Sequence, residues 1–169
     1  MEQKSQKLLN SLSEYYSTKN RFNIIETIIN TNPNSTNVSL RLVDWLITNY
    51  SKSKNVVYYV KGAPFNVHQS YKNMLKAYSK RLFDPFRRHG RILLEHDGRV
   101  LETTVAQLSF FRWAIENDVL KYANEHREAI KNNMDVHTKN KNTDHKRGAL
   151  SKQTKGASVY SVNICVSFT

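Results

Sequence analysis

The sequence has little of what disulfide-bonded, metal-binding or membrane-spanning proteins need. Cys165 is the only cysteine, so the chain has neither an internal disulfide framework nor a zinc site built from cysteines. No apolar run approaches the roughly 18 residues of a membrane helix, and the amino-terminal segment is polar and amphipathic rather than signal-like. We therefore expect a reducing, intracellular setting and no membrane partner.

Motifs of common enzyme classes are also missing. Neither GxxxxGK[ST] nor GxGxxG occurs, so no glycine-rich loop is available to cradle a phosphate. His89, His96 and Asp97 are a weak candidate metal site, and ordinary surface histidines are the simpler reading. Asp84, Glu95 and Asp97 resemble the acidic cluster of a hairpin nuclease, but Asp97 stands where such sites place a lysine. We expect no catalytic residue, metal or cofactor.

Positive charge is abundant and unevenly distributed. The net charge is +12 and the isoelectric point about 9.8. Residues 41–91 hold eleven Lys/Arg and two Asp/Glu, residues 92–135 hold five and eight, and residues 136–169 hold six and one. Frequent Asn, Lys and Ile are typical of an AT-rich genome, which explains part of the lysine excess but not the arginines. This separation favours an acidic partner such as nucleic acid over a uniformly solubilising surface.

Hydrophobic periodicity predicts a single, mostly helical α+β domain over residues 1–135. Helices are expected at residues 5–16, 20–30, 40–50, 66–81, 105–117 and about 119–131. Thr104 and Gln107 have capping-box spacing at the start of helix 105–117, which is apolar nearly all round and is expected to be the central buried helix. Residues 55–60 are β-branched and aromatic, and the segments 91–95 and 99–103 flank an Asp-Gly turn, which together predict a small antiparallel sheet. By analogy alone, the order helix–strand–helix–helix–strand–strand is that of a winged helix.

The composition changes at about residue 136. Residues 136–169 have little apolar content before the last segment and predict a basic, flexible tail. The final "SVNICVSFT" alternates apolar and polar residues as a strand does. Pairing at a sheet edge, docking on a partner and a disordered end remain alternatives for it.

The basic block contains the candidate nucleic-acid site. Lysines recur every fourth residue along the expected helix 66–81 and form a stripe, which alone is also typical of a solvated face. The arginines that follow can hold phosphate in bidentate fashion, so we expect them to be the strongest part of the site. In a winged helix, Arg99 would lie on the wing. The candidate residues are Lys72, Lys76, Lys80, Arg81, Arg87, Arg88, Arg91 and Arg99.

Four tyrosines near the basic block are the more open aromatic residues. They are Tyr58, Tyr59, Tyr71 and Tyr78. Exposed tyrosines beside lysines are able to stack on unpaired bases. Tyr71 and Tyr78 share the apolar stripe of their helix, however, so we expect these two to be buried.

Three segments resemble a known family. They are "SLRLVDWLITNYSKSKNVVYY", "VHQSYKNMLKAYSKRLFDPFRR" and "ETTVAQLSFFRWAIENDVL". Over about residues 38–131, with the tail outside, the chain resembles uncharacterised proteins of the nucleocytoplasmic large DNA viruses. The resemblance carries over no activity or binding residues. It implies a setting in the host cytoplasm, at the viral replication site, or in the virion.

Two function classes remain after these exclusions. The first is a non-enzymatic, largely sequence-independent nucleic-acid-binding protein whose Lys/Arg patch contacts DNA or RNA. The alternative is a minor virion or scaffold protein, whose basic patch meets acidic surfaces of viral structural proteins and whose final segment adds a strand to a partner. A metal-dependent nuclease is a distant third.

Overall fold

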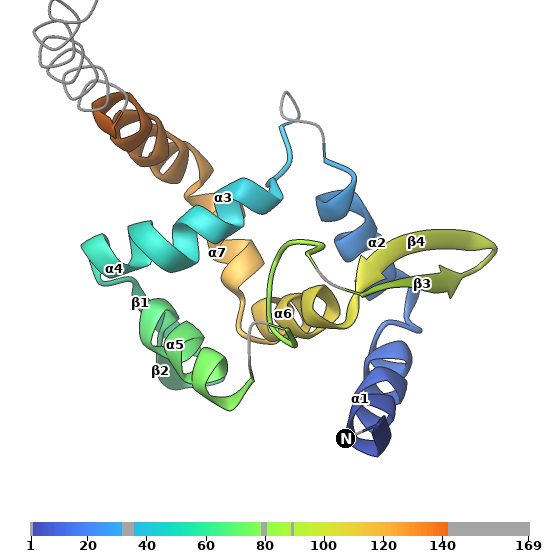
Figure 1. The fold of residues 1–169 in the computed structure, drawn as a ribbon. Helices are drawn as coiled ribbons and strands as arrows, with labels where there is room; N and C mark the ends of the chain where they lie inside the picture. The colour runs from blue at the N-terminus through green and yellow to red at the C-terminus, as the bar shows by residue number, and fades with distance from the viewer. Residues whose placement is uncertain (1, 32–35, 79–80, 89, 142–169) are drawn as a thin grey trace, which may run out of the picture. The chain divides into compact units, whose positions relative to one another are not determined.

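A computed structural model describes residues 2–31, 36–78, 81–88 and 90–141 (Figure 1). The chain divides into two compact units, residues 1–131 and residues 132–169. The elements are α1 (Glu2–Tyr15), α2 (Lys19–Ile29), α3 (Leu40–Trp45), η1 (Leu46–Tyr50), α4 (Ser51–Lys54), β1 (Val57–Val60), β2 (Ala63–Asn66), α5 (Val67–Ala77), β3 (Arg91–His96), β4 (Arg99–Thr104), α6 (Val105–Glu116) and α7 (Val119–Glu125). The predicted mostly helical α+β class is confirmed.

Helix α6 is the centre of the first unit's core. Its sequence is apolar on nearly every side, and Leu108, Phe110 and Phe111 are completely buried. The helix begins where Thr104 Oγ1 accepts a hydrogen bond from the Gln107 amide at 3.1 Å, which is the predicted cap. From the carboxyl end of α1, the Tyr16 hydroxyl donates to the Leu108 carbonyl at 2.8 Å. The expectation of a central buried helix is confirmed.

The helix expected at residues 40–50 extends to Lys54. Ser39 caps its start, and the turn Leu46–Tyr50 is π-helical, so the segment joins α3 to α4 without a break. The run ends at Asn55, whose φ of 48° is left-handed, as is common where helices stop. This left-handed residue directs the chain into strand β1.

The β3–β4 hairpin has the expected two-residue turn. Asp97 and Gly98 have φ values of 48° and 73°, as a type I′ turn requires. The turn fixes an antiparallel register in which Arg91 lies opposite Thr104 and Leu93 lies opposite Glu102. The hairpin prediction is confirmed.

A second hairpin was not expected. Lys61 and Gly62 have φ values of 50° and 81° and turn β1 back into β2, so that Tyr59 lies opposite Pro64. Helix α5 follows directly, where Asn66 Oδ1 accepts from the Gln69 amide at 2.9 Å. Periodicity alone missed β2, because its sequence contains a proline and no β-branched residue.

The winged-helix topology is not confirmed. Strand β1 pairs with β2, and β3 pairs with β4, so the described residues form two separate two-stranded sheets rather than one three-stranded sheet. The described residues between α5 and β3 contain no helix either. Instead, Asp84 Oδ1 accepts from the Phe86 amide at 3.1 Å, which folds this segment into a loop.

Residues 127–131 and, in the second unit, residues 132–141 are helical. Residues 136–141, where composition predicts the tail to begin, are therefore helical. The expected tail from residue 142, its final strand included, lies outside the described residues, and the domain boundary at 135 stays a prediction. None of the described helices has the length and apolar character needed to span a membrane.

Candidate nucleic-acid interface

A buried phenylalanine holds the loop that carries the arginines. Phe83 is 1% exposed. Its ring centroid lies 6.1 Å from that of Tyr71 and 6.4 Å from that of Tyr78, both on the α5 side, and 5.3 Å from that of Phe110 on α6. Residues 81–88, called the basic loop below, are therefore wedged between α5 and α6 by one side chain.

Hydrogen bonds fix the same loop to the first turn of α6. The Gln107 side-chain amide donates to the Pro85 carbonyl at 2.8 Å, and its oxygen accepts from Thr103 Oγ1 at 2.9 Å. The Asp84 amide donates to the Ala106 carbonyl at 3.3 Å. Because the Gln107 side chain is fully buried, losing one of these partners would leave a desolvated polar group. Figure 1 shows the loop running past α6.

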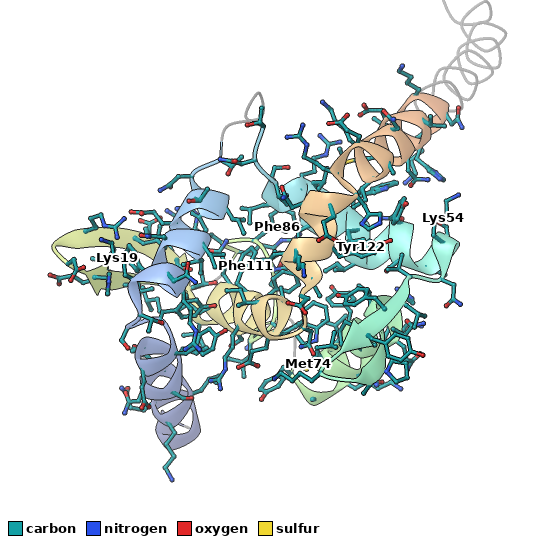
Figure 2. The ribbon with its side chains drawn as sticks, turned by 180° about the vertical axis from the view of Figure 1, so that it is seen from behind. Lys19, Lys54, Met74, Phe86, Phe111 and Tyr122 are labelled. Atoms are coloured by element: carbon teal, nitrogen blue, oxygen red, sulfur yellow. The ribbon has the colours of Figure 1, made fainter. Side chains whose placement is uncertain are left out.

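These anchors bring the predicted lysine stripe and the basic loop together. Lys72 and Lys76 are exposed on α5, while Tyr71 of the same helix contacts Phe83. Burial raises the pKa of the Tyr71 phenol, the Asp44 and Asp84 carboxylates raise it further, and the nearby Arg88 lowers it. Figure 2 labels one residue of each of the three elements, Phe86 of the basic loop, Met74 of α5 and Phe111 of α6.

Two carboxylates partly neutralise the arginine cluster. Arg91 Nη1 lies 2.8 Å from Glu102 Oε1, and Arg87 Nη1 lies 3.4 Å from the same oxygen. Arg88 Nε lies 3.4 Å from Asp84 Oδ2, and its guanidinium lies 5.0 Å from the Phe86 ring centroid. All three arginines remain exposed to solvent. Three guanidinium groups thus face two carboxylates, which leaves the cluster with one net positive charge.

The remaining candidate residues differ in whether a carboxylate pairs with them. Lys72, Lys76 and Arg81 are exposed and make no ion pair with any described residue. We call these three residues the free patch. Lys80 lies outside the described residues. An unpaired exposed cation loses only water when it meets a phosphate, whereas a paired arginine must first leave its carboxylate.

Arg99 lies against α2 rather than on a free wing. Its guanidinium forms an ion pair with Glu26, donates to Asn23 Oδ1 at 2.8 Å and lies 4.9 Å from the Phe22 ring centroid. These contacts join the tip of the β3–β4 hairpin to α2. Arg99 therefore has a structural explanation, and we leave it out of the candidate interface.

Of the candidate metal and nuclease residues, the structure brings His96 and Asp97 together, with Nε2 3.3 Å from Oδ2. Asp84 is 7% exposed and folds its own loop, while Asp97 occupies the hairpin turn. Among the residues that the structure describes, no three His, Cys, Asp or Glu side chains gather as metal ligands would. His89 lies outside that part of the chain.

The sequence analysis did not identify two features of the site. One is Glu102, which the register of the Asp97–Gly98 turn places on the same hairpin face as Arg91. The other is an acid-free segment: from Trp45 to Phe83 the chain has seven Lys/Arg and no Asp or Glu. A charge count over shorter windows finds the second directly.

Comparisons with known proteins extend the likeness beyond residues 38–131. The family model described as a family of unknown function (DUF7197) matches residues 1–164. The match therefore includes most of the tail, which the motif resemblance leaves out. The chain is 31% identical over 176 residues to "Uncharacterized protein L507" of Acanthamoeba polyphaga mimivirus, covering 95% of this chain and 67% of that protein. No solved structure matches the chain. The chain therefore belongs to the family of unknown function DUF7197, and with it to the uncharacterised family of large DNA viruses that its motifs indicate.

Proposed function

We propose that this protein is a non-enzymatic nucleic-acid-binding protein of a large DNA virus, largely independent of sequence. Its contacts are made by the free patch, with a smaller share from Arg87, Arg88 and Arg91. It acts in the host cytoplasm at the replication site, in the virion, or in both. The viral setting is supported by the mimivirus relative.

The observation that carries the proposal is the acid-free segment. Its cations Lys72 and Lys76 are exposed on α5, the helix whose Tyr71 contacts Phe83, and Arg81 is exposed in the basic loop. Their own segment contains no carboxylate to neutralise them. Phosphate is the partner that exposed, unpaired cations bind regardless of base sequence. A basic surface kept only for solubility does not need the removal of every acid from such a stretch.

The competing function is a minor virion or scaffold protein. It is favoured by Leu93 and Val100, which are 71% and 58% exposed on the β3–β4 hairpin, because exposed apolar residues on a sheet are common in protein contacts. Co-purification with viral structural proteins after nuclease treatment, without affinity for oligonucleotides, would support this function instead.

Fluorescence anisotropy with labelled oligonucleotides tests the main proposal. The full chain is expected to bind duplex and single-stranded probes at about 50 mM salt, with log Kd rising linearly with log salt by about 0.9 for each duplex phosphate contacted and about 0.7 on a single strand. Absence of binding to DNA and RNA at that salt concentration would refute the proposal.

Replacing Glu102 by glutamine is expected to strengthen binding. The change releases both Arg87 and Arg91 from their shared carboxylate. If each then contacts a phosphate, the salt slope on duplex DNA steepens by up to about 1.8. The measurement is the same salt titration, with affinity compared at each salt concentration.

Glu95→Gln is the matched control. Glu95 is exposed on the same hairpin and forms no ion pair with the described residues, so this change removes one negative charge without releasing an arginine. Its slope should steepen by less than that of Glu102→Gln. Equal changes in both variants would mean that overall charge, rather than the release of Arg87 and Arg91, controls binding.

A further inference from the structure

The β1–β2 hairpin has an outer face dominated by one open aromatic ring. Tyr59 is 76% exposed and the neighbouring Val57 on the same face is 48% exposed. Tyr59 lies opposite Pro64, and directly opposed residues of an antiparallel pair lie on the same face. Tyr59, Val57 and Pro64 thus share one small, mostly apolar face of the hairpin.

The inner face of this hairpin already serves as its anchor. Tyr58 donates its hydroxyl hydrogen to the Asn117 carbonyl at 2.8 Å, and its ring stacks on Tyr122 with centroids 5.3 Å apart. Burial raises the pKa of the Tyr58 phenol. Phe65 packs beside it, with ring centroids 5.5 Å apart. Tyr59 is therefore not needed to hold the hairpin on the unit.

Lysines lie at both ends of the hairpin. Lys61 forms the turn, and Lys54 ends α4, next to Asn55, whose side chain accepts from the Asn66 amide group at 3.1 Å. Both lysines are exposed and belong to the acid-free segment. Figure 2 labels Lys54 at the outer end of α4, and Figure 1 shows α4, the hairpin and α5 grouped together.

We propose that the outer face of the β1–β2 hairpin binds single-stranded nucleic acid, with Tyr59 stacking on an unpaired base and Lys54 and Lys61 holding the flanking phosphates. This rests on the proposed function and deepens it, since it names single strands as the preferred class. A base inside a duplex is already stacked on both sides and offers no free face to Tyr59. An exposed aromatic ring between cations is the arrangement by which sequence-tolerant proteins hold unpaired strands.

The ring, rather than the hydroxyl, carries the interaction. Tyr59→Phe should therefore bind like the unchanged protein, and Tyr59→Ala should not. Because Tyr59 faces solvent, neither change should disturb the anchor made by Tyr58 and Phe65. Matching circular dichroism spectra and unfolding curves for the two variants would verify this.

The test uses the full chain and four probes of equal length, about 16 nucleotides. They are single-stranded DNA, single-stranded RNA, duplex DNA and an abasic DNA strand that has the phosphates but no bases. Tyr59→Ala is expected to weaken binding to the two base-containing single strands by about fivefold to 150-fold. Affinity for the duplex and the abasic strand should stay within about twofold. A loss on only one of the single strands would show whether DNA or RNA is the ligand.

Several outcomes would overturn the inference while leaving the proposed function standing. One is salt-dependent binding to every probe that Tyr59→Ala leaves unchanged, which would make the outer face a protein-contact surface or a purely structural one. Another is an equal loss on the abasic strand, which would remove stacking as the cause. A Tyr59→Phe variant as weak as Tyr59→Ala would assign the effect to the hydroxyl. Failure of the unchanged protein to bind any probe would instead refute the proposed function itself.

Discussion

Replacing Phe83 by alanine is expected to lower the free energy of unfolding by about 3–5 kcal/mol, the usual effect of truncating a buried aromatic ring. Phe83 is 1% exposed and is surrounded by the rings of Tyr71, Tyr78, Phe110 and Trp113. Small domains are stable by only about 5–15 kcal/mol, so one truncation removes a large part of the total. Urea unfolding followed by circular dichroism measures it.

Phe86→Ala is the matched control from the same loop. Phe86 is only half-buried, and Arg88 contacts its ring from the solvent side. We expect a loss of about 1 kcal/mol, as for a partly exposed side chain. Equal losses in the two variants would contradict the role of Phe83 as the wedge that fixes the basic loop.

The helices could be predicted because their signals are local. Apolar spacing located α1, α2, α5 and α6 to within a few residues, and Thr104 marked the start of α6 correctly. The Asp97–Gly98 turn determined the β3–β4 hairpin in the same way. Strand β2 was missed because its own sequence, Ala63–Asn66, has no strand pattern. It exists because Lys61 and Gly62 both adopt positive φ and direct the chain back along β1.

The sequence predicted which basic residues form the candidate interface, but not which carboxylates pair with them. Sequence placed Arg87, Arg88 and Arg91 in one basic cluster, and charge counting treated each as free. Glu102 is eleven residues from Arg91 along the chain, and only the hairpin register brings the two together. The arginines were expected to be the strongest part of the site. Because the arginines pair with carboxylates, we now expect the unpaired Lys72, Lys76 and Arg81 to contribute most to binding.

Removal of the free patch is accordingly expected to give the largest loss of binding. The variant Lys72→Gln, Lys76→Gln and Arg81→Gln keeps side chains of similar length and, on α5, good helix formers. If each cation contacts one phosphate, the salt slope on duplex DNA flattens by up to about 2.7, and affinity near 50 mM salt falls by up to roughly 10³-fold. A salt titration by fluorescence anisotropy measures both.

A second triple variant separates free from paired charge. Arg87→Gln, Arg91→Gln and Glu102→Gln together remove the shared ion pairs as one group, so the net charge falls by one rather than three. We expect this variant to flatten the slope by no more than about 0.9. If it flattened the slope as much as loss of the free patch does, the arginines would be the principal phosphate contacts despite their pairing with Glu102. A smaller change would mean that nucleic acid binds where the fold leaves cations without carboxylates, because a guanidinium already held by a carboxylate gains little by exchanging it for a phosphate.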